Sequence, residues 1–532
     1  MTPIIFEQLR RVHEYLSNMN YLLWIVLIIN GGWYLSSIGA GGLWLDEVLY
    51  ARAGYSVLTG NPFVNPTHMF APLGKYIIGI GQLIFGTTPF GARIGVVIVS
   101  ILVLGIYYAV AKRMGRPVVG LLSVIAVSSI PLFVSHATSA MLDIPLVGAV
   151  TALSGLVVLE SENTGGKWRD IGFGILFILV SSTKSYGIIY AIGPLIAYSV
   201  LRRSNVQTRR FAIRVGSGMS GAFVITFLPL MLASPPNYYG GASIPHIAKS
   251  IFNIPVIGGL VYAFGASLYH NITGHGTIAS PSLHRLVLWV VEGGPLVITG
   301  VIISVGSYFV PERLRLTPWW VSPLLVLLPL IMFTIVLPKG FARYALPVFP
   351  TAVFFGILLY VESIQNYTLS DNQKKIGIVV LFLLIISPAS AFVIGNTHPS
   401  ADSQYDDVSK YLLSSSDKDV VIISQNSIVL KWHLGDTYVE HYNFDPTEST
   451  TFSTRDQSIT VSGISPIRQK SYEVAEERIR TENVDYILFN GEPETIQELN
   501  ISSCGDRVRT WRAYSTGEYG THQVSIWDIA DC

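Results

Sequence analysis

The sequence predicts a polytopic α-helical membrane protein that ends in a soluble α/β domain. Half of the 532 residues are hydrophobic and only 13% are charged, against roughly 25% in a typical soluble protein. Residues 1–394 hold 24 Lys and Arg against 12 Asp and Glu, whereas residues 395–532 hold 11 against 22. This division excludes a single soluble globule, a disordered chain and a nucleic-acid-binding module, whose basic residues would form a solvated face.

Membrane spans are predicted from apolar runs of about 17–25 residues. We expect about eleven, which together with their loops form a transmembrane domain over residues 1–394: 21–39, 93–111, 117–135, 143–160, 170–184, 186–201, 211–233, 286–309, 318–337, 344–361 and 376–394. The apolar segment from Pro72 to Gly86 is shorter. It is predicted to be a juxtamembrane or re-entrant helix within a long first external loop, residues 40–92.

Orientation follows from six clusters of Lys and Arg that fall in alternate connections between the predicted spans. They are Arg10/Arg11, Lys112/Arg113/Arg116, Lys167/Arg169, Arg202/Arg203/Arg209/Arg210, Arg313/Arg315 and Lys374/Lys375. Because short cytoplasmic loops are enriched in these residues, we expect a multi-pass protein of the cell membrane with its amino terminus in the cytoplasm. The first span is expected to be retained, because no small-residue cleavage site follows it.

The C-terminal part, residues 395–532, is then extracytoplasmic and is predicted to be a small α/β domain. Residues 420–424, 485–489 and 522–527 have the character of short strands, and residues 471–480 that of a helix. Cys504 and Cys532 are the only cysteines. An external compartment permits a disulfide between them, and the alternative is two free thiols.

Acidic residues of the membrane part divide by predicted side. Eight lie at cytoplasmic ends, where exposure to solvent explains them: Glu7, Glu14, Glu160, Glu162, Asp170, Glu312, Glu362 and Asp371. Four acids and eight bases lie at external ends: Asp46, Glu47, Asp143 and Glu292, with Arg52, Lys75, Arg93, Lys184, Lys249, Arg285, Lys339 and Arg343. This balance indicates a site for an anionic, phosphate-bearing substrate. The alternative for single cations at helix ends is snorkelling to the membrane surface.

The adjacent acids Asp46 and Glu47 lie between apolar residues just after the first span. Carboxylates within the membrane zone are costly, so they are candidates for function. Such a pair indicates a general base, a metal ligand or both. The alternative is a helix start, where carboxylates oppose the positive end of the helix dipole.

Four further motifs support the functional interpretation. His68 to Lys75 (HMFAPLGK) follows the acidic pair by about 25 residues, and Ala140–Pro145 (AMLDIP), Ser182–Gly187 (STKSYG) and Pro338–Pro350 (PKGFARYALPVFP) come later. Together with Asp46-Glu47, these segments resemble the motifs of GT-C membrane glycosyltransferases that use polyprenyl-phosphate sugars. The resemblance covers roughly residues 20–360 and is to protein O-mannosyltransferases and lipid A aminoarabinose transferases in particular. These families often carry an Arg shortly before the Leu-Asp sequence that here is Leu142-Asp143. That Arg is absent from this chain, where His136 lies in the same region. Arg93 is the candidate substitute for its contact with the donor phosphate.

The resemblance implies a GT-C-like fold and transfer of a sugar, with mannose as one candidate, from a polyprenyl or dolichyl phosphate to an acceptor hydroxyl at the external face. Asp46 is then the candidate base, and Glu47 and Asp143 position the acceptor or share a divalent ion such as Mg or Mn. Donor phosphate and substrate would be bound by Lys75, Arg93, Lys184, Arg343, Tyr344 and His68. Direct attack predicts inversion at the anomeric carbon, because no second carboxylate is required as a nucleophile.

Two alternatives remain at this stage. Within enzymes, the acceptor is a lipid or lipid-linked glycan rather than a protein. In another class, the chain is a lipid or sugar transporter with an external sensory domain. Transporters place charges near the bilayer midplane and interrupt paired helices in two related halves, and neither feature is found in this sequence.

Overall fold

The protein is described by a computed structural model. The described residues are 20–38, 43, 45–60, 72–161, 166–184, 186–203, 208–232, 295–306, 318, 320–336, 342–366, 408–412, 420–424, 450–453, 458–463, 484–490, 506–514 and 521–528.

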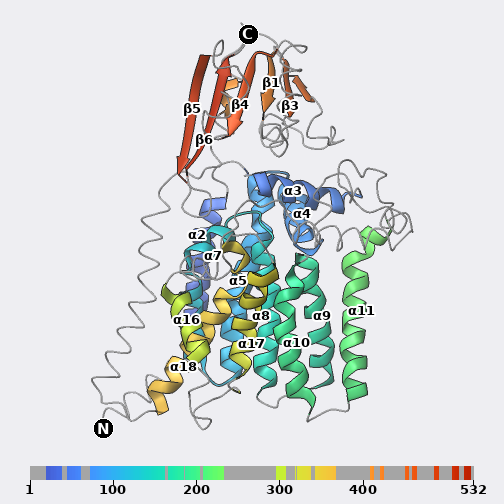
Figure 1. Cartoon of the computed structure of the whole chain (residues 1–532), viewed down its shortest axis with the longest axis vertical. Coiled ribbons are helices and arrows are strands. Elements are labelled where there is room, and N and C mark those ends of the chain that lie inside the picture. The colour runs from blue at the N-terminus through green and yellow to red at the C-terminus, as the bar shows by residue number, and fades with distance from the viewer. Residues whose placement is uncertain are drawn as a thin grey trace.

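Long apolar helices lie side by side and make up most of the described chain (Figure 1). In chain order they are α2 (Asn20–Ile38), α3 (Leu45–Leu58), α4 (Leu73–Phe85), α5 (Pro89–Arg113), α6 (Pro117–Val127), α7 (Pro131–Ala137), α8 (Asp143–Glu160), α9 (Lys167–Thr183), α10 (Gly187–Arg203), α11 (Thr208–Leu232), α16 (Pro295–Gly306), α17 (Val321–Val336), the short 3₁₀ helix η5 (Ala342–Tyr344) and α18 (Phe349–Asn366).

The predicted helical character is confirmed. A helix lies in each predicted span except 376–394, which is outside the described residues. By length and composition, four described helices could cross a membrane: α2, α5, α8 and the Thr208–Leu228 part of α11. The helices α6 and α7, bent by 75° at their junction, could form one more. Large apolar side chains exposed on α2, such as Trp24, Ile28 and Ile29, agree with a lipid-facing helix.

The short apolar segment after Pro72 forms the helix α4, which packs closely against α3 and α5. Glycines permit this approach, because a Cβ on Gly79 would overlap the carbonyl oxygen of Gly54 in α3. A Cβ on Gly95 in α5 would likewise overlap the carbonyl oxygen of Ile77. The backbones of the three helices therefore touch, and side chains on α4 are held in place by its neighbours.

One prediction was wrong at the other end of these helices. Glu160 and Asp170 were expected to be solvated, but both are buried, with 2% and 0% of their surface exposed. Arg202 donates from Nη1 to Glu160 at 3.0 Å and from Nε and Nη2 to Asp170 at 2.9 and 3.0 Å. Arg169 and Arg214 complete a network of ion pairs that ties α8 to α11 together. Buried carboxylates require such partners.

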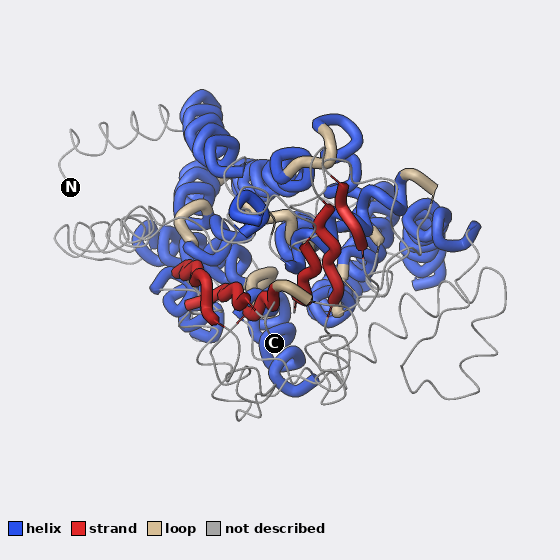
Figure 2. The backbone as a smooth tube through the Cα atoms, turned by 90° about the horizontal axis from the view of Figure 1, so that it is seen from above, coloured by secondary structure: helices blue, strands red, loops and turns tan. Residues whose placement is uncertain are grey.

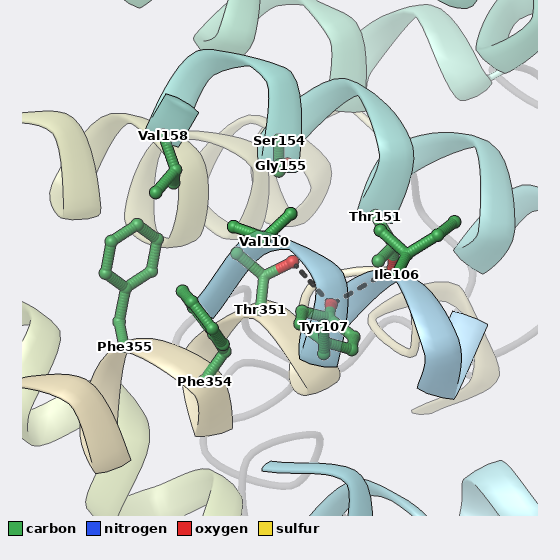
Figure 3. A pocket seen from close by; sticks show the side chains of 10 residues that line it. All are labelled: Ile106, Tyr107, Val110, Thr151, Ser154, Gly155, Val158, Thr351, Phe354 and Phe355. Carbon is green, nitrogen blue, oxygen red and sulfur yellow. Dashed lines mark hydrogen bonds between the residues drawn. The ribbon is translucent and has the colours of Figure 1, made fainter. Parts of the chain in front are cut away.

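Between these two ends, a polar contact joins three helices. The hydroxyl of Tyr107 in α5 lies 3.0 Å from Thr151 in α8 and 3.2 Å from Thr351 in α18 (Figure 3). Ser154 lines a cavity of about 10 Å³ beside these residues, which is about the space of a single water molecule. The remaining lining is apolar, so this region is packing rather than a substrate site.

Six strands between residues 420 and 528 form one sheet, which lies beyond the end of the helices at which α3 lies (Figures 1 and 2). The order is β2 (Thr450–Ser453), β3 (Ser458–Gly463), β1 (Val420–Ser424), β4 (Tyr486–Asn490), β6 (Thr521–Asp528), β5 (Asp506–Tyr514). β1 pairs in parallel with β3 and β4, and the other pairs are antiparallel. The three predicted strands are present as β1, β4 and β6, whereas the predicted helix 471–480 and both cysteines are outside the described residues.

Candidate functional site

The described site residues lie on α3, α4, α5, α8 and η5 and just after α9. Figure 1 shows α3 and α4 together at one end of the long helices. Asp143 is the first residue of α8 and Lys184 directly follows α9, so the two antiparallel helices bring them to the same end. Arg93 lies near the start of α5. That start is fixed by Thr88, whose hydroxyl accepts a hydrogen bond from the Gly91 N–H at 3.1 Å, and by Pro89 in the first turn.

Glu47 and Arg93 form a buried, bidentate ion pair. Arg93 donates from Nε and Nη2 to the two carboxylate oxygens of Glu47 at 2.8 and 2.7 Å. Glu47 also accepts the backbone N–H of Ala140 at 2.6 Å, and Arg93 donates to the carbonyl oxygen of Ile38 at 3.3 Å. This pair therefore joins the end of α2, the starts of α3 and α5, and the segment that leads into α8.

Asp143 and Lys184 form a second buried pair. Lys184 Nζ donates to Asp143 Oδ1 at 2.7 Å, and their side chains are 5% and 0% exposed, respectively. Among the described residues, Oδ2 of Asp143 has no hydrogen-bond partner. This carboxylate oxygen can therefore accept a hydrogen bond from a substrate.

Asp46 and Arg343 form the third pair, which is the most exposed of the three. Arg343 Nη1 donates to Asp46 Oδ2 at 3.1 Å, and the side chains are 9% and 24% exposed, respectively. Because Asp46 precedes Glu47 at the start of α3, the Glu47–Arg93 pair also fixes the backbone that carries Asp46.

Tyrosine rings bring the second and third pairs together. Lys184 Nζ lies 5.7 Å and Arg343 Cζ 5.6 Å from the ring centroid of Tyr344. Tyr186 packs edge-on against Tyr344 at 5.2 Å and lies 5.3 Å from Lys184 Nζ. Cations within about 6 Å of an aromatic ring are attracted to it. Two cations from distant parts of the chain therefore share one aromatic surface.

Lys75 occupies the first turn of α4 and is buried. Burial lowers the pKa of Lys75 to about 7, because removal from water disfavours the charged form. The preceding residue, Gly74, packs against the side chain of Leu142, next to Asp143. The remaining predicted residue, His68, is outside the described residues.

Sequence reasoning missed two contributors to this site, and named His136 only as a neighbour. Tyr50 lies four residues after Asp46, on the same face of α3. Its pKa is raised by burial and by the charge of Asp46. His136 donates from Nδ1 to the Leu132 carbonyl at 3.0 Å and interacts electrostatically with Asp143. Tyr186 follows Lys184 by two residues. Spacing along α3 could have indicated Tyr50, and Tyr186 lies within the motif of residues 182–187, whereas no local signal connected His136 with Asp143.

A shared divalent ion at Asp46, Glu47 and Asp143 does not fit this arrangement. Each carboxylate is bonded to its own cation, and both oxygens of Glu47 are engaged by Arg93. Within the described part of the chain, no group of three or more His, Cys, Asp and Glu is arranged to hold a metal.

Comparisons with known sequences agree with the predicted resemblance. Residues 68–232 match the family model described as dolichyl-phosphate-mannose-protein mannosyltransferase, a segment that includes Lys75, Arg93, Asp143 and Lys184. The undecaprenyl phosphate-alpha-4-amino-4-deoxy-L-arabinose arabinosyl transferase of Pseudomonas aeruginosa is 33% identical over 99 residues, which are 17% of this chain and 18% of that protein. The polyprenol-phosphate-mannose–protein mannosyltransferase of Mycobacterium tuberculosis is 25% identical over 201 residues, 32% and 38% of the two chains.

The fold is shared more widely than the sequence. ArnT from Cupriavidus metallidurans in the apo state superposes with a TM-score of 0.56 over 95% of this chain and 97% of its own, at 11% identity. The chain thus aligns with less than a fifth of the arabinosyl transferase by sequence, but with nearly all of ArnT by fold. The predicted resemblance to GT-C glycosyltransferases is confirmed, and the apolar helices place the chain among multi-pass membrane proteins.

Proposed function

We propose that this chain is a membrane glycosyltransferase that moves a sugar from a polyprenyl-phosphate carrier to an acceptor hydroxyl. The observation that carries the proposal is the meeting of a partly exposed carboxylate, Asp46, with two cations, Arg343 and Lys184, at one end of the helices. The matched relatives support it, since their names specify undecaprenyl-phosphate and polyprenol-phosphate sugars. ArnT has also been solved with bound undecaprenyl phosphate.

The proposed reaction needs a proton acceptor and positive charge. The acceptor oxygen attacks the anomeric carbon, the bond from that carbon to the phosphate oxygen breaks, and the lipid phosphate leaves with the electron pair. Asp46 takes the acceptor proton, because it is the most accessible of the three carboxylates. Arg343, Lys184 and Lys75 stabilise the released phosphate. Attack on the face opposite the leaving group inverts the anomeric configuration.

Glu47 and Arg93 have a different role in this proposal. Their bidentate pair is buried and fixes backbone segments rather than contacting substrate. Asp143 orients Lys184 and offers its second oxygen to a substrate hydroxyl. Mannose is the sugar named by the matching family model, and the acceptor is a hydroxyl of a protein, glycan or lipid.

The proposal includes a membrane arrangement. Eleven spans with a cytoplasmic amino terminus would place the site, and the sheet of residues 420–528, on the extracytoplasmic side. A lipid-linked donor and the acceptor would then meet at that membrane surface.

The test is release of lipid phosphate from polyprenyl-phosphate mannose by the purified full-length protein. Asp46→Asn keeps the shape of the side chain but removes the proton acceptor, and a positioned base contributes typically about 10²–10⁴-fold in rate. We expect a loss of that size with donor binding retained. Normal transfer by Asp46→Asn in a folded protein would show that Asp46 is not the base. A wild-type protein that neither binds nor cleaves the donor would contradict the proposed function.

A further inference from the structure

We propose that the donor phosphate and the Asp46 carboxylate compete for Arg343, so that donor binding itself releases Asp46 to accept the acceptor proton. This inference rests on the proposed function. It adds an order of events: the donor binds first, and only then is the base available to the acceptor.

The three ion pairs of the site differ in how easily a ligand could replace one partner. Glu47 and Arg93 share two hydrogen bonds of 2.8 and 2.7 Å, and their side chains are 3% and 4% exposed. Lys184 and Asp143 are joined at 2.7 Å and are equally buried. Asp46 and Arg343, in contrast, share one hydrogen bond of 3.1 Å, and Asp46 is 24% exposed. Partly exposed ion pairs are weak, so this pair is the one that an incoming anion can open.

The bond to Arg343 engages one of the two oxygens of the Asp46 carboxylate. Oδ2 of Asp46 accepts a hydrogen bond from an Arg343 N–H, and the described residues provide no second hydrogen bond to the Asp46 carboxylate. While that bond persists, the guanidinium of Arg343 covers Oδ2 of the Asp46 carboxylate. An acceptor hydroxyl must donate its own proton to an Asp46 oxygen, in the geometry of a hydrogen bond, before transfer. The resting pair therefore hinders the base.

A phosphate is the natural replacement for Asp46 on this guanidinium. Arginine binds phosphate oxygens through two parallel N–H groups, in the same manner as it binds a carboxylate. Lys184 lies over the same Tyr344 ring as Arg343 and would attract the same anion. A phosphate held between these cations gains two charged contacts, whereas Asp46 makes one hydrogen bond with Arg343.

Loss of a residue at a binding site ordinarily weakens ligand affinity, whereas loss of the Asp46 carboxylate is predicted to strengthen it. Asp46→Asn removes the competing carboxylate, so undecaprenyl phosphate should bind more tightly although transfer is lost. Because a partly exposed ion pair contributes little, we expect binding about 2–5-fold tighter than wild type. Asp46→Ala removes the same competitor and should tighten binding similarly, which provides a second variant if one of them fails to fold.

Glu47→Gln is the matched control, because it removes the same charge one position along the chain. Its partner Arg93 is 3% exposed and also bonded to the Ile38 carbonyl, so no accessible cation is released. Affinity for undecaprenyl phosphate should therefore stay near the wild-type value. In an Arg343→Met background, adding Asp46→Asn should no longer tighten binding, because the contested cation is absent.

The experiment measures the dissociation constant of undecaprenyl phosphate for the full-length protein and these variants in detergent. Tighter binding only where Asp46 is changed and Arg343 is present supports competition. Equal tightening in Glu47→Gln would assign the effect to overall charge and overturn the inference. Unchanged or weaker binding in Asp46→Asn and Asp46→Ala would also overturn it, leaving the proposed function intact. No binding by the wild-type protein would instead refute the proposed function.

Discussion

Replacement of Arg93 by Met should destabilise the protein far more than loss of a surface charge. Methionine keeps much of the apolar stem but removes the two hydrogen bonds that Arg93 donates to Glu47. The Glu47 side chain is 3% exposed, so its charge would remain buried with the Ala140 N–H as a remaining hydrogen-bond donor. Breaking a buried pair by removing one partner costs about 3–5 kcal/mol. We expect the free energy of unfolding to fall by that amount.

The assay is thermal unfolding in one detergent, followed by intrinsic fluorescence, for the wild type, Arg93→Met and the double variant Arg93→Met/Glu47→Gln. The double variant leaves no charge at these two positions, and replacing both partners of a buried pair is often close to neutral. It should therefore recover most of the lost stability. Unfolding of Arg93→Met at the wild-type temperature would refute this reasoning. If that variant instead lost donor affinity alone, Arg93 would be a phosphate ligand and not a link between helices.

Three further predictions follow from other parts of the molecule. Burial holds the pKa of Lys75 near 7, and a donor phosphate must bind the protonated, positively charged form of this side chain. Donor affinity should therefore fall by up to tenfold per pH unit above pH 7. Lys75→Met should remove that pH dependence. Gly79→Ala places a methyl group against the Gly54 carbonyl, so it should separate α3 from α4 and lower both thermal stability and sugar transfer. The control is Gly60→Ala, where the added atom has open space around it and should affect chiefly its own turn. Cysteine introduced as Ser415→Cys should react with a membrane-impermeant reagent in intact cells, and labelling only after permeabilisation would contradict the proposed orientation.

The helices were predictable because their cause is local. Apolar runs of sufficient length give α8 over its full range, α2 to within one residue and α5 to within four, and the too-short segment after Pro72 gives the separate helix α4. The carboxylates were also identifiable, because Asp46, Glu47 and Asp143 are charged residues in apolar surroundings. Composition and spacing carried this information without any knowledge of contacts.

The pairing of those charges was not predictable, because it depends on tertiary structure. Asp46 and Arg343 are 297 residues apart in the chain, and no periodicity connects them. Arg93 was expected to bind phosphate but is bonded to Glu47, which lies on another helix. Glu160 and Asp170 were misassigned for the same reason: a rule that counts Lys and Arg by side of the membrane does not report which acid each one meets.

The network around Arg202 has a consequence for how the chain assembles. Glu160 ends α8 and Asp170 lies in the first turn of α9, so both are synthesised before the arginine that serves them at the end of α10. Until Arg202 emerges, neither acid has this guanidinium, and within the hairpin of α8 and α9 Glu160 meets Arg169 at 3.5 Å. Arg214 on α11 arrives later still. We therefore expect the ion-pair network to form fully only after α10 and α11 have been synthesised.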